Sequence, residues 1–140
     1  FKNWPNPNIP QVAAGVYVIW QGEELLYAGM SGREIEKAIK DGKKKYGLVT
    51  RLASHASGRL SGDQFCVYVA NRIVIPELKQ SQLNKFRDGT VTLDQMTKNF
   101  IRTKLEYQYL LVDRSQDAID LEQHCRSGAI FGILPLLNPD

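Results

Sequence analysis

The chain has 140 residues, a net charge of +3 at pH 7 and 43% hydrophobic residues, the composition of a folded globular protein with a single domain spanning residues 1–140. No apolar run approaches the roughly 20 residues that a membrane-spanning helix needs, and no secretory signal is visible, so we expect a cytoplasmic protein without a membrane partner. Cys66 and Cys125 have no metal-ligand spacing to either histidine, and we expect both to be buried thiols, Cys66 in a strand and Cys125 in a helix.

The amino-terminal segment predicts an extended arm and a hairpin. Residues 1–11 contain three prolines and three asparagines, which disfavour a helix. In residues 12–20, Val16, Val18 and Trp20 alternate with Tyr17 and Ile19, which is the period of a strand. A polar turn at residues 21–24 leads into a second strand at residues 25–29. The two strands therefore predict a β-hairpin.

A short loop and a short helix are expected next. Residues 30–32 form the loop, and Ser31 can cap the helix that follows. Residues 33–40 place Ile35 and Ile39 one turn apart, which predicts one apolar face.

A basic loop and a second helix follow. Residues 41–47 form a lysine-rich loop, and residues 48–57 have an apolar stripe typical of an amphipathic helix that ends at Gly58. Arg51 and His55 are four residues apart, so they project from a shared face of that helix.

The middle of the chain is less regular and is interpreted as an insertion within the domain, at about residues 64–104. Residues 64–71 are rich in β-branched and aromatic side chains and predict a strand. Residues 76–86 and 93–101 predict helical stretches.

The last third predicts a strand, a helix and an apolar tail. Residues 105–112 alternate as a strand does. Ser115 is a suitable N-cap for a helix through residues 118–125, with Glu122 on or beside its buried face. The tail at residues 130–137 is apolar.

Five side chains could together perform phosphodiester hydrolysis. Arg51 is a charged fork suited to phosphate, and His55 can relay a proton near neutral pH. Tyr17 and Tyr27 can donate to phosphate oxygens or accept a proton, and Glu122 can hold Mg²⁺ through one carboxylate. No cluster of carboxylates suggests a second ion. Each side chain alone is more often a packing or surface residue, so spacing by itself indicates only a basic α+β domain that could bind nucleic acid.

Positive charge is concentrated beside the predicted site. Five basic residues fall within one 17-residue stretch that contains no acid, namely Lys43, Lys44, Lys45, Arg51 and Arg59. Such a stretch suggests an anionic partner, although a solvated loop would look the same.

The order of these residues resembles that of a GIY-YIG endonuclease domain. The two motif halves correspond to Gly15-Val16-Tyr17 and Tyr27-Ala28-Gly29, and the helix with arginine and histidine one turn apart corresponds to Arg51 and His55. The later strand and glutamate helix correspond to residues 105–113 and 118–122, and the terminal asparagine to Asn138 before Pro139. The resemblance runs in order from Gly15 to Pro139.

The resemblance implies a fold and a branch of the family. The fold is a small α/β (α+β) domain with a central, mostly antiparallel sheet of about three core strands flanked by helices. The inserted strand and helical segment at about residues 64–104 is more similar to the restriction-enzyme branch than to the compact repair domains.

The resemblance also implies roles for the site residues. Tyr17 would be the general base or would position the attacking water, with His55 assisting, and Tyr27 would orient a phosphate oxygen. Arg51 would neutralise charge on the phosphate, and Glu122 would hold one Mg²⁺ or Mn²⁺ ion. Asn138 would support the site or contact phosphate. Further DNA or phosphate contacts are expected from Arg33, Lys43, Lys44, Lys45 and Arg59.

The expected function is metal-dependent cleavage of duplex DNA, as a type II restriction enzyme that could act as a homodimer. Residues 72–102 are the expected source of sequence specificity. Two departures from the family pattern are Ala28, in place of a branched residue, and Met30, where many members have lysine or glutamine. The alternatives are a non-catalytic nucleic-acid-binding module, a repair or structure-specific nickase, and a protein-interaction domain.

Overall fold

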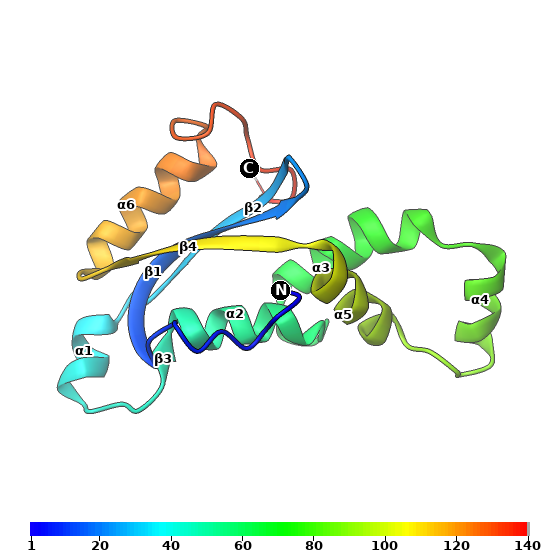
Figure 1. Ribbon diagram of the computed structural model, residues 1–140, viewed down its shortest axis with the longest axis horizontal. Coiled ribbons are helices and arrows are strands. Elements are labelled where there is room, and N and C mark those ends of the chain that lie inside the picture. Colours follow the sequence, from blue (N-terminus) through cyan, green and yellow to red (C-terminus); the bar gives the residue numbers. More distant parts are fainter. Residues whose placement is uncertain (140) are drawn as a thin grey trace.

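A four-stranded, mostly antiparallel sheet with helices on both faces forms the centre of the computed structural model, which describes residues 1–139 (Figure 1). The expected α+β fold class is confirmed. Strand β1 (Val12–Gln21) lies in the middle and pairs antiparallel with β2 (Glu24–Ser31) and β4 (Glu106–Val112). The two-residue strand β3 (Tyr46–Gly47) pairs in parallel with the start of β1 and adds a short strand that the sequence did not predict.

Alternation along β1 separates the hydrophobic core into two clusters. Val16 and Val18 pack with Ala118 and Cys125 of helix α6 (Ser115–Arg126) on one face. Tyr17 and Ile19 pack on the other face, against helix α2 (Leu48–Ser57). Figure 1 shows α6 and α2 on opposite sides of the sheet. The strand period expected from the sequence is therefore what gives the sheet two buried faces.

The hairpin is confirmed, but the arm is not extended, because turns bring the Trp4 N–H to the Phe1 oxygen and the Ile9 N–H to the Asn6 oxygen. Residues 1–11 contain no helix, and Phe1 and Ile9 anchor the arm in the core. Strand β2 is longer than expected because Met30 and Ser31, predicted to lie in a loop, continue its pairing with β1.

Helix α1 (Ile35–Lys40) differs from the prediction at both of its expected contacts. Ser31 does not cap it, because Ser31 is the last residue of β2 and Glu34 precedes the helix. Ile35 is buried as expected, but Ile39 is 63% exposed, and Ala38 takes the inward position three residues after Ile35.

The predicted strand at residues 64–71 is wrong. These residues form helix α3 (Gln64–Val69), which continues into the π-helical segment η1 (Ala70–Val74) and the 3-10 turn η2 (Ile75–Glu77). Strand propensity is overridden because Asp63 caps the helix by accepting the Cys66 N–H at 2.9 Å. The buried side chains then follow a helical spacing, at residues 65, 66, 69, 70 and 73. Cys66 is buried as expected, but in a helix.

The rest of the middle segment is helical as well, so it contains no inserted strand. Helix α4 (Gln80–Arg87) and helix α5 (Leu93–Lys104) form a projection at one end of the molecule (Figure 1). Helix α5 packs on α2 and η1, and its first turn is held by reciprocal hydrogen bonds between Thr92 and Gln95.

The carboxy-terminal elements follow the prediction with one change at the start of α6. Ser115 is the first residue of the helix, and its N–H and hydroxyl both donate to Glu36 at 2.9 Å instead of capping. Cys125 is a buried free thiol in α6 as expected. Within residues 1–139, no helix combines the length and the apolar character needed to cross a bilayer.

Leu52 tests the packing of α2 on the sheet. Its side chain is fully buried in the α2-side cluster, so Leu52→Ala should lower the free energy of unfolding by about 2–5 kcal/mol through the cavity it leaves. Urea denaturation measures the change. Leu134→Ala is the control, because Leu134 is 70% exposed and its truncation should change stability by less than about 0.5 kcal/mol. Equal effects of the two substitutions would contradict the observed packing.

Candidate active site

A buried chain of hydrogen bonds joins Tyr17, His55 and Asp63. The Tyr17 hydroxyl lies 2.7 Å from His55 Nε2, and His55 Nδ1 lies 2.8 Å from Asp63 Oδ2. Tyr17 and His55 are only 2% and 3% exposed. The three side chains come from β1, from α2 and from the residue that caps α3, so the chain connects three separate elements.

The surroundings of Asp63 fix its carboxylate. Oδ1 accepts the Cys66 N–H as the cap of α3, and Oδ2 accepts the Ser54 hydroxyl at 2.5 Å in addition to the His55 contact. Burial raises the pKa of Asp63, but the hydrogen bond and charge of His55 and the donors Ser54 and Cys66 outweigh burial and hold the pKa well below its usual value. The carboxylate is therefore ionised at neutral pH.

An ionised Asp63 determines the direction of the hydrogen bonds. A carboxylate can only accept, so His55 Nδ1 carries the proton that it donates to Asp63. In the neutral imidazole this leaves Nε2 as an acceptor for the Tyr17 hydroxyl. The arrangement thus points a base at the phenol and stabilises that base from behind, as in other nucleophile–histidine–carboxylate chains.

Tyr17 remains a neutral phenol in this environment. Burial raises its pKa well above the usual value, and the charges of Tyr27, Asp63 and Glu122 raise it further against the opposing effect of Arg51. Tyr17 can therefore exchange a proton only through a partner that removes its own, and His55 Nε2 is the partner in contact.

Both motif glycines lie where a neighbouring strand residue comes too close for a side chain: Tyr17 at Gly29 and Leu110 at Gly15. Gly29 lies opposite Tyr17 in the pairing of β1 with β2, and a Cβ at Gly29 would overlap the Tyr17 hydroxyl. A Cβ at Gly15 would come within 2.7 Å of the backbone oxygen of Leu110 in β4. Neither glycine has a positive φ, so space, and not backbone conformation, requires them.

Tyr27 lies beside this chain with its ring half-buried. Its ring stacks on Tyr17 with centroids 6.3 Å apart and meets His55 edge-on at 6.0 Å. Burial raises the pKa of Tyr27, with Glu122 as the next cause. Tyr27 therefore also stays protonated and can donate a hydrogen bond.

Arg51 and Glu122 bring opposite charges to the two tyrosines. Arg51 is exposed on the first half of α2, and the Glu122 side chain on α6 is 13% exposed. The charge of Arg51 lowers and that of Glu122 raises the pKa of both Tyr17 and Tyr27, so both act on the same small region. The structure thus brings Tyr17, Tyr27 and His55 side by side, and the charges of Arg51 on α2 and Glu122 on α6 act on the two tyrosines.

Glu122 supplies the one carboxylate expected for a metal ion. Residues 1–139 contain no group of three or more His, Cys, Asp or Glu side chains arranged to hold an ion. Arg126 Nη1 lies 3.5 Å from Glu122 Oε1 and would compete with a cation. A single carboxylate nevertheless fits Mg²⁺, which keeps most of its waters and takes further ligands from substrate phosphates.

Asn138 has a supporting position. Its side-chain oxygen accepts the Ala28 N–H at 2.8 Å, and its amino group donates to the Ala28 oxygen at 2.9 Å. The tail also donates from the Leu136 and Leu137 N–H groups to the backbone of β2. Asn138 therefore holds the strand that carries Tyr27, and its expected contact with phosphate stays a prediction.

The expected phosphate-binding cations do not form one cluster. The three lysines at positions 43–45 precede α2, with Lys43 5.2 Å above the Tyr46 ring, and Arg59 follows the other end of the helix. A helix of this length spans about 15 Å. Arg33 is exposed between β2 and α1. The lysines and Arg59 therefore lie at opposite ends of α2, and a DNA backbone would contact both groups by running along this helix.

Sequence reasoning missed Asp63, Ser54 and Arg126. Asp63 had one signal, a carboxylate three residues before Cys66 at a possible helix start, but the neighbouring residues were interpreted as a strand. Arg126 also had a signal, because it lies four residues after Glu122 on the same helix. Ser54 had none, because its contact with Asp63 depends on tertiary packing.

Comparisons with protein-family models, with curated proteins and with solved structures find no match for this chain.

The depressed pKa of Asp63 predicts a pH-dependent contribution to stability. The ionised carboxylate stabilises the fold above the pKa of about 3.9 that an unfolded Asp has, and this contribution is lost as the pH falls from there toward the lower folded-state value. Asp63→Asn should therefore lower the free energy of unfolding at pH 7 by about 1.5–3 kcal/mol and flatten its decline below about pH 5.

Urea denaturation at several pH values measures both effects. Asp41→Asn is the matched control, since Asp41 is exposed at the end of α1. Asp63→Asn curves that run parallel to those of the unmodified protein at every pH would rule out the ionised hydrogen-bond chain.

Proposed function

We propose that the protein is a metal-dependent DNA endonuclease of the GIY-YIG type. The observation that carries the proposal is the Tyr17–His55–Asp63 chain, which ends in a phenol whose pKa is affected by the charges of both Arg51 and Glu122. A proton acceptor, an anion-binding cation and a carboxylate for a divalent ion are the groups that phosphodiester hydrolysis needs.

The protein side chains provide a route for the proton of the attacking water. The Tyr17 oxygen accepts this proton while its own proton moves to His55 Nε2, 2.7 Å away. The imidazolium that forms is stabilised by the ionised Asp63 at Nδ1. Because the Tyr17 proton leaves as the water proton arrives, the buried phenol never has to carry a full charge.

Arg51 and Tyr27 act on the phosphate. Arg51 neutralises the charge that develops on the non-bridging oxygens as water attacks phosphorus and the bond to the 3′ oxygen breaks. Tyr27 donates its hydroxyl proton to a phosphate oxygen and orients the group. When bound, one Mg²⁺ or Mn²⁺ ion at Glu122 would supply Lewis-acid stabilisation of the phosphate and the departing 3′ oxygen.

The substrate that fits best is duplex DNA. Exposed cations flank α2, with positions 43–45 before the helix and Arg59 after it, and a phosphate backbone running along α2 would contact both groups. A type II restriction enzyme acting as a homodimer on a palindrome is the form we favour. Two buried free thiols suit a reducing compartment, so we propose the cytoplasm.

A second candidate is a non-catalytic nucleic-acid-binding module on the same fold. It is favoured by the burial of Tyr17 and His55, which leaves little surface for a reacting water, and by Met30, which is buried where many members of the resembling family have a polar residue. In this alternative the hydrogen-bond chain only stabilises the fold.

Plasmid cleavage separates the two candidates. Incubated with Mg²⁺, the protein should linearise or nick supercoiled plasmid, and EDTA should abolish the reaction. Tyr17→Phe should reduce the rate by about 10²–10⁴-fold because the proton route is broken. Glu122→Ala should abolish cleavage while DNA is still retarded on a gel.

Two matched controls check these variants. Tyr109→Phe removes a hydroxyl from the strand residue paired with Tyr17, and Glu23→Ala removes an exposed carboxylate in the hairpin turn. Both should cut at the unmodified rate. Cleavage by Glu122→Ala at that rate would overturn the metal assignment, and DNA retardation without cleavage under any divalent ion would favour the binding module.

A further inference from the structure

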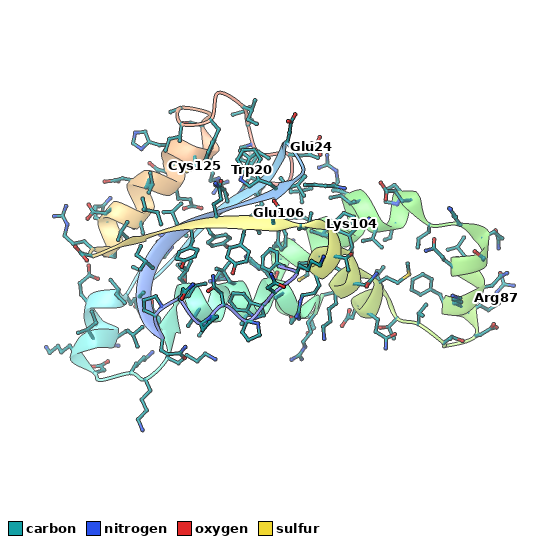
Figure 2. All side chains as sticks on the ribbon, viewed as in Figure 1. Trp20, Glu24, Arg87, Lys104, Glu106 and Cys125 are labelled. Atoms are coloured by element: carbon teal, nitrogen blue, oxygen red, sulfur yellow. The ribbon has the colours of Figure 1, made fainter. Side chains whose placement is uncertain are left out.

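Helix α4 has no packing that explains its presence. None of its eight residues is buried, and it stands at the end of the molecule farthest from the sheet (Figure 1). Figure 2 shows Arg87 at this outer end, directed away from the sheet. Isolated helices this short are marginal in water. The helix therefore gains little from the rest of the chain, and a binding partner would supply the missing contacts.

The outer face of α4 carries a particular set of side chains. Gln82 and Phe86 are its two half-buried residues and mark the inner face. At 100° per residue, the opposite face is formed by Gln80, Ser81, Asn84 and Arg87, with Lys85 and Leu83 at its two borders. It has no acidic side chain, and its amides and cations are the groups that pair with base edges in the major groove, Asn and Gln with adenine and Arg and Lys with guanine.

Two of these amides are already ordered. The Gln80 amino group donates to the Asn84 side-chain oxygen at 3.3 Å, one helical turn away. The Gln80 oxygen and the Asn84 amino group keep acceptor and donor capacity, which is the combination that an adenine edge requires.

The positive charge of the chain lies in the segment that carries α4. Residues 71–104 contain seven of the 18 Lys and Arg residues and three of the 15 Asp and Glu residues. The remaining 106 residues therefore contain eleven basic and twelve acidic residues and have no net positive charge. Charge complementarity favours a polyanion over a second copy of this chain as the partner of the projection.

We propose that α4 is a recognition helix that enters the major groove of duplex DNA and contacts base edges through Gln80, Asn84 and Arg87. An α-helix about 10–12 Å wide fits a groove about 12 Å wide. Helix α5, about 18 Å long, separates α4 from β4, so the bases contacted lie away from the phosphate at the Tyr17 site. The assignment names the source of specificity of the proposed nuclease and rests on that function only for its link to cleavage.

Selection from a random duplex library tests the inference without requiring cleavage. Tyr17→Phe protein is mixed with random 30-base-pair DNA in EDTA, and bound DNA is recovered and sequenced. This parent protein should enrich a defined sequence. Adding Gln80→Ala and Asn84→Ala, which removes no charge, should erase about 5- to 100-fold of preference at each adenine contacted. Its affinity for unselected DNA should stay within about twofold, because phosphate contacts dominate that affinity.

Two further variants separate charge from base contact. Arg87→Lys keeps the charge but loses the paired donors, so it should weaken preference at a guanine and leave the salt dependence of binding unchanged. Lys37→Ala with Lys40→Ala removes two exposed cations from α1, at the other end of the molecule, and should leave the enriched sequence unaltered.

Each outcome decides the question. An enriched sequence that is unchanged in the Gln80 and Asn84 double variant, or a parent that binds DNA without preference, would overturn the assignment of α4. A double variant that changes the oligomeric state and not the enriched sequence would indicate a second copy as the partner. Selective binding that depends on α4, together with no cleavage by the unmodified protein, would sustain the recognition helix and reject the proposed nuclease.

Discussion

The hydrogen-bond chain from Tyr17 through His55 to Asp63 holds the parts of this structure in register. A buried carboxylate is costly unless its lone pairs are occupied, and Asp63 meets this requirement with donors from His55, Ser54 and the Cys66 N–H. These donors belong to α2 and α3, and His55 in turn fixes the phenol of β1. A shift of any of the three elements would leave a charged or polar group unpaired in the interior, so the chain specifies their arrangement as well as the chemistry of Tyr17.

The candidate site depends equally on both faces of the sheet. Helix α2 contributes Arg51 from one side and α6 contributes Glu122 from the other, and both charges act on the tyrosines of β1 and β2. Within residues 1–139, β2 pairs with β1 as its one neighbouring strand. The tail hydrogen-bonds to the other edge of β2 through Asn138. Gly29 completes the arrangement by leaving room for the Tyr17 hydroxyl. The site thus draws on both faces of a rigid sheet.

Asp63 also connects the chemistry to the projection. The side chain that orients His55 is the cap of α3, and the chain runs from α3 through η1 and η2 to α4. The division of charge follows the same boundary, with the excess of basic residues in the projection and a nearly neutral balance around the sheet. In our proposal the sheet carries the phosphate chemistry and the projection carries the contacts to DNA bases.

The sequence by itself determined the hairpin, helix α2, strand β4, helix α6 and the fold class, because each has a hydrophobic period that local sterics dictate. It also indicated Tyr17, Tyr27, Arg51, His55 and Glu122, by their order along the chain. Only the tertiary structure decided that residues 64–69 are a helix, since burial and the Asp63 cap outweigh their strand propensity. It also decided the partners, namely Asp63 behind His55 and Asn138 on Ala28. A hydrogen bond between residues distant in sequence has no periodicity to reveal it, because packing alone brings its two atoms together.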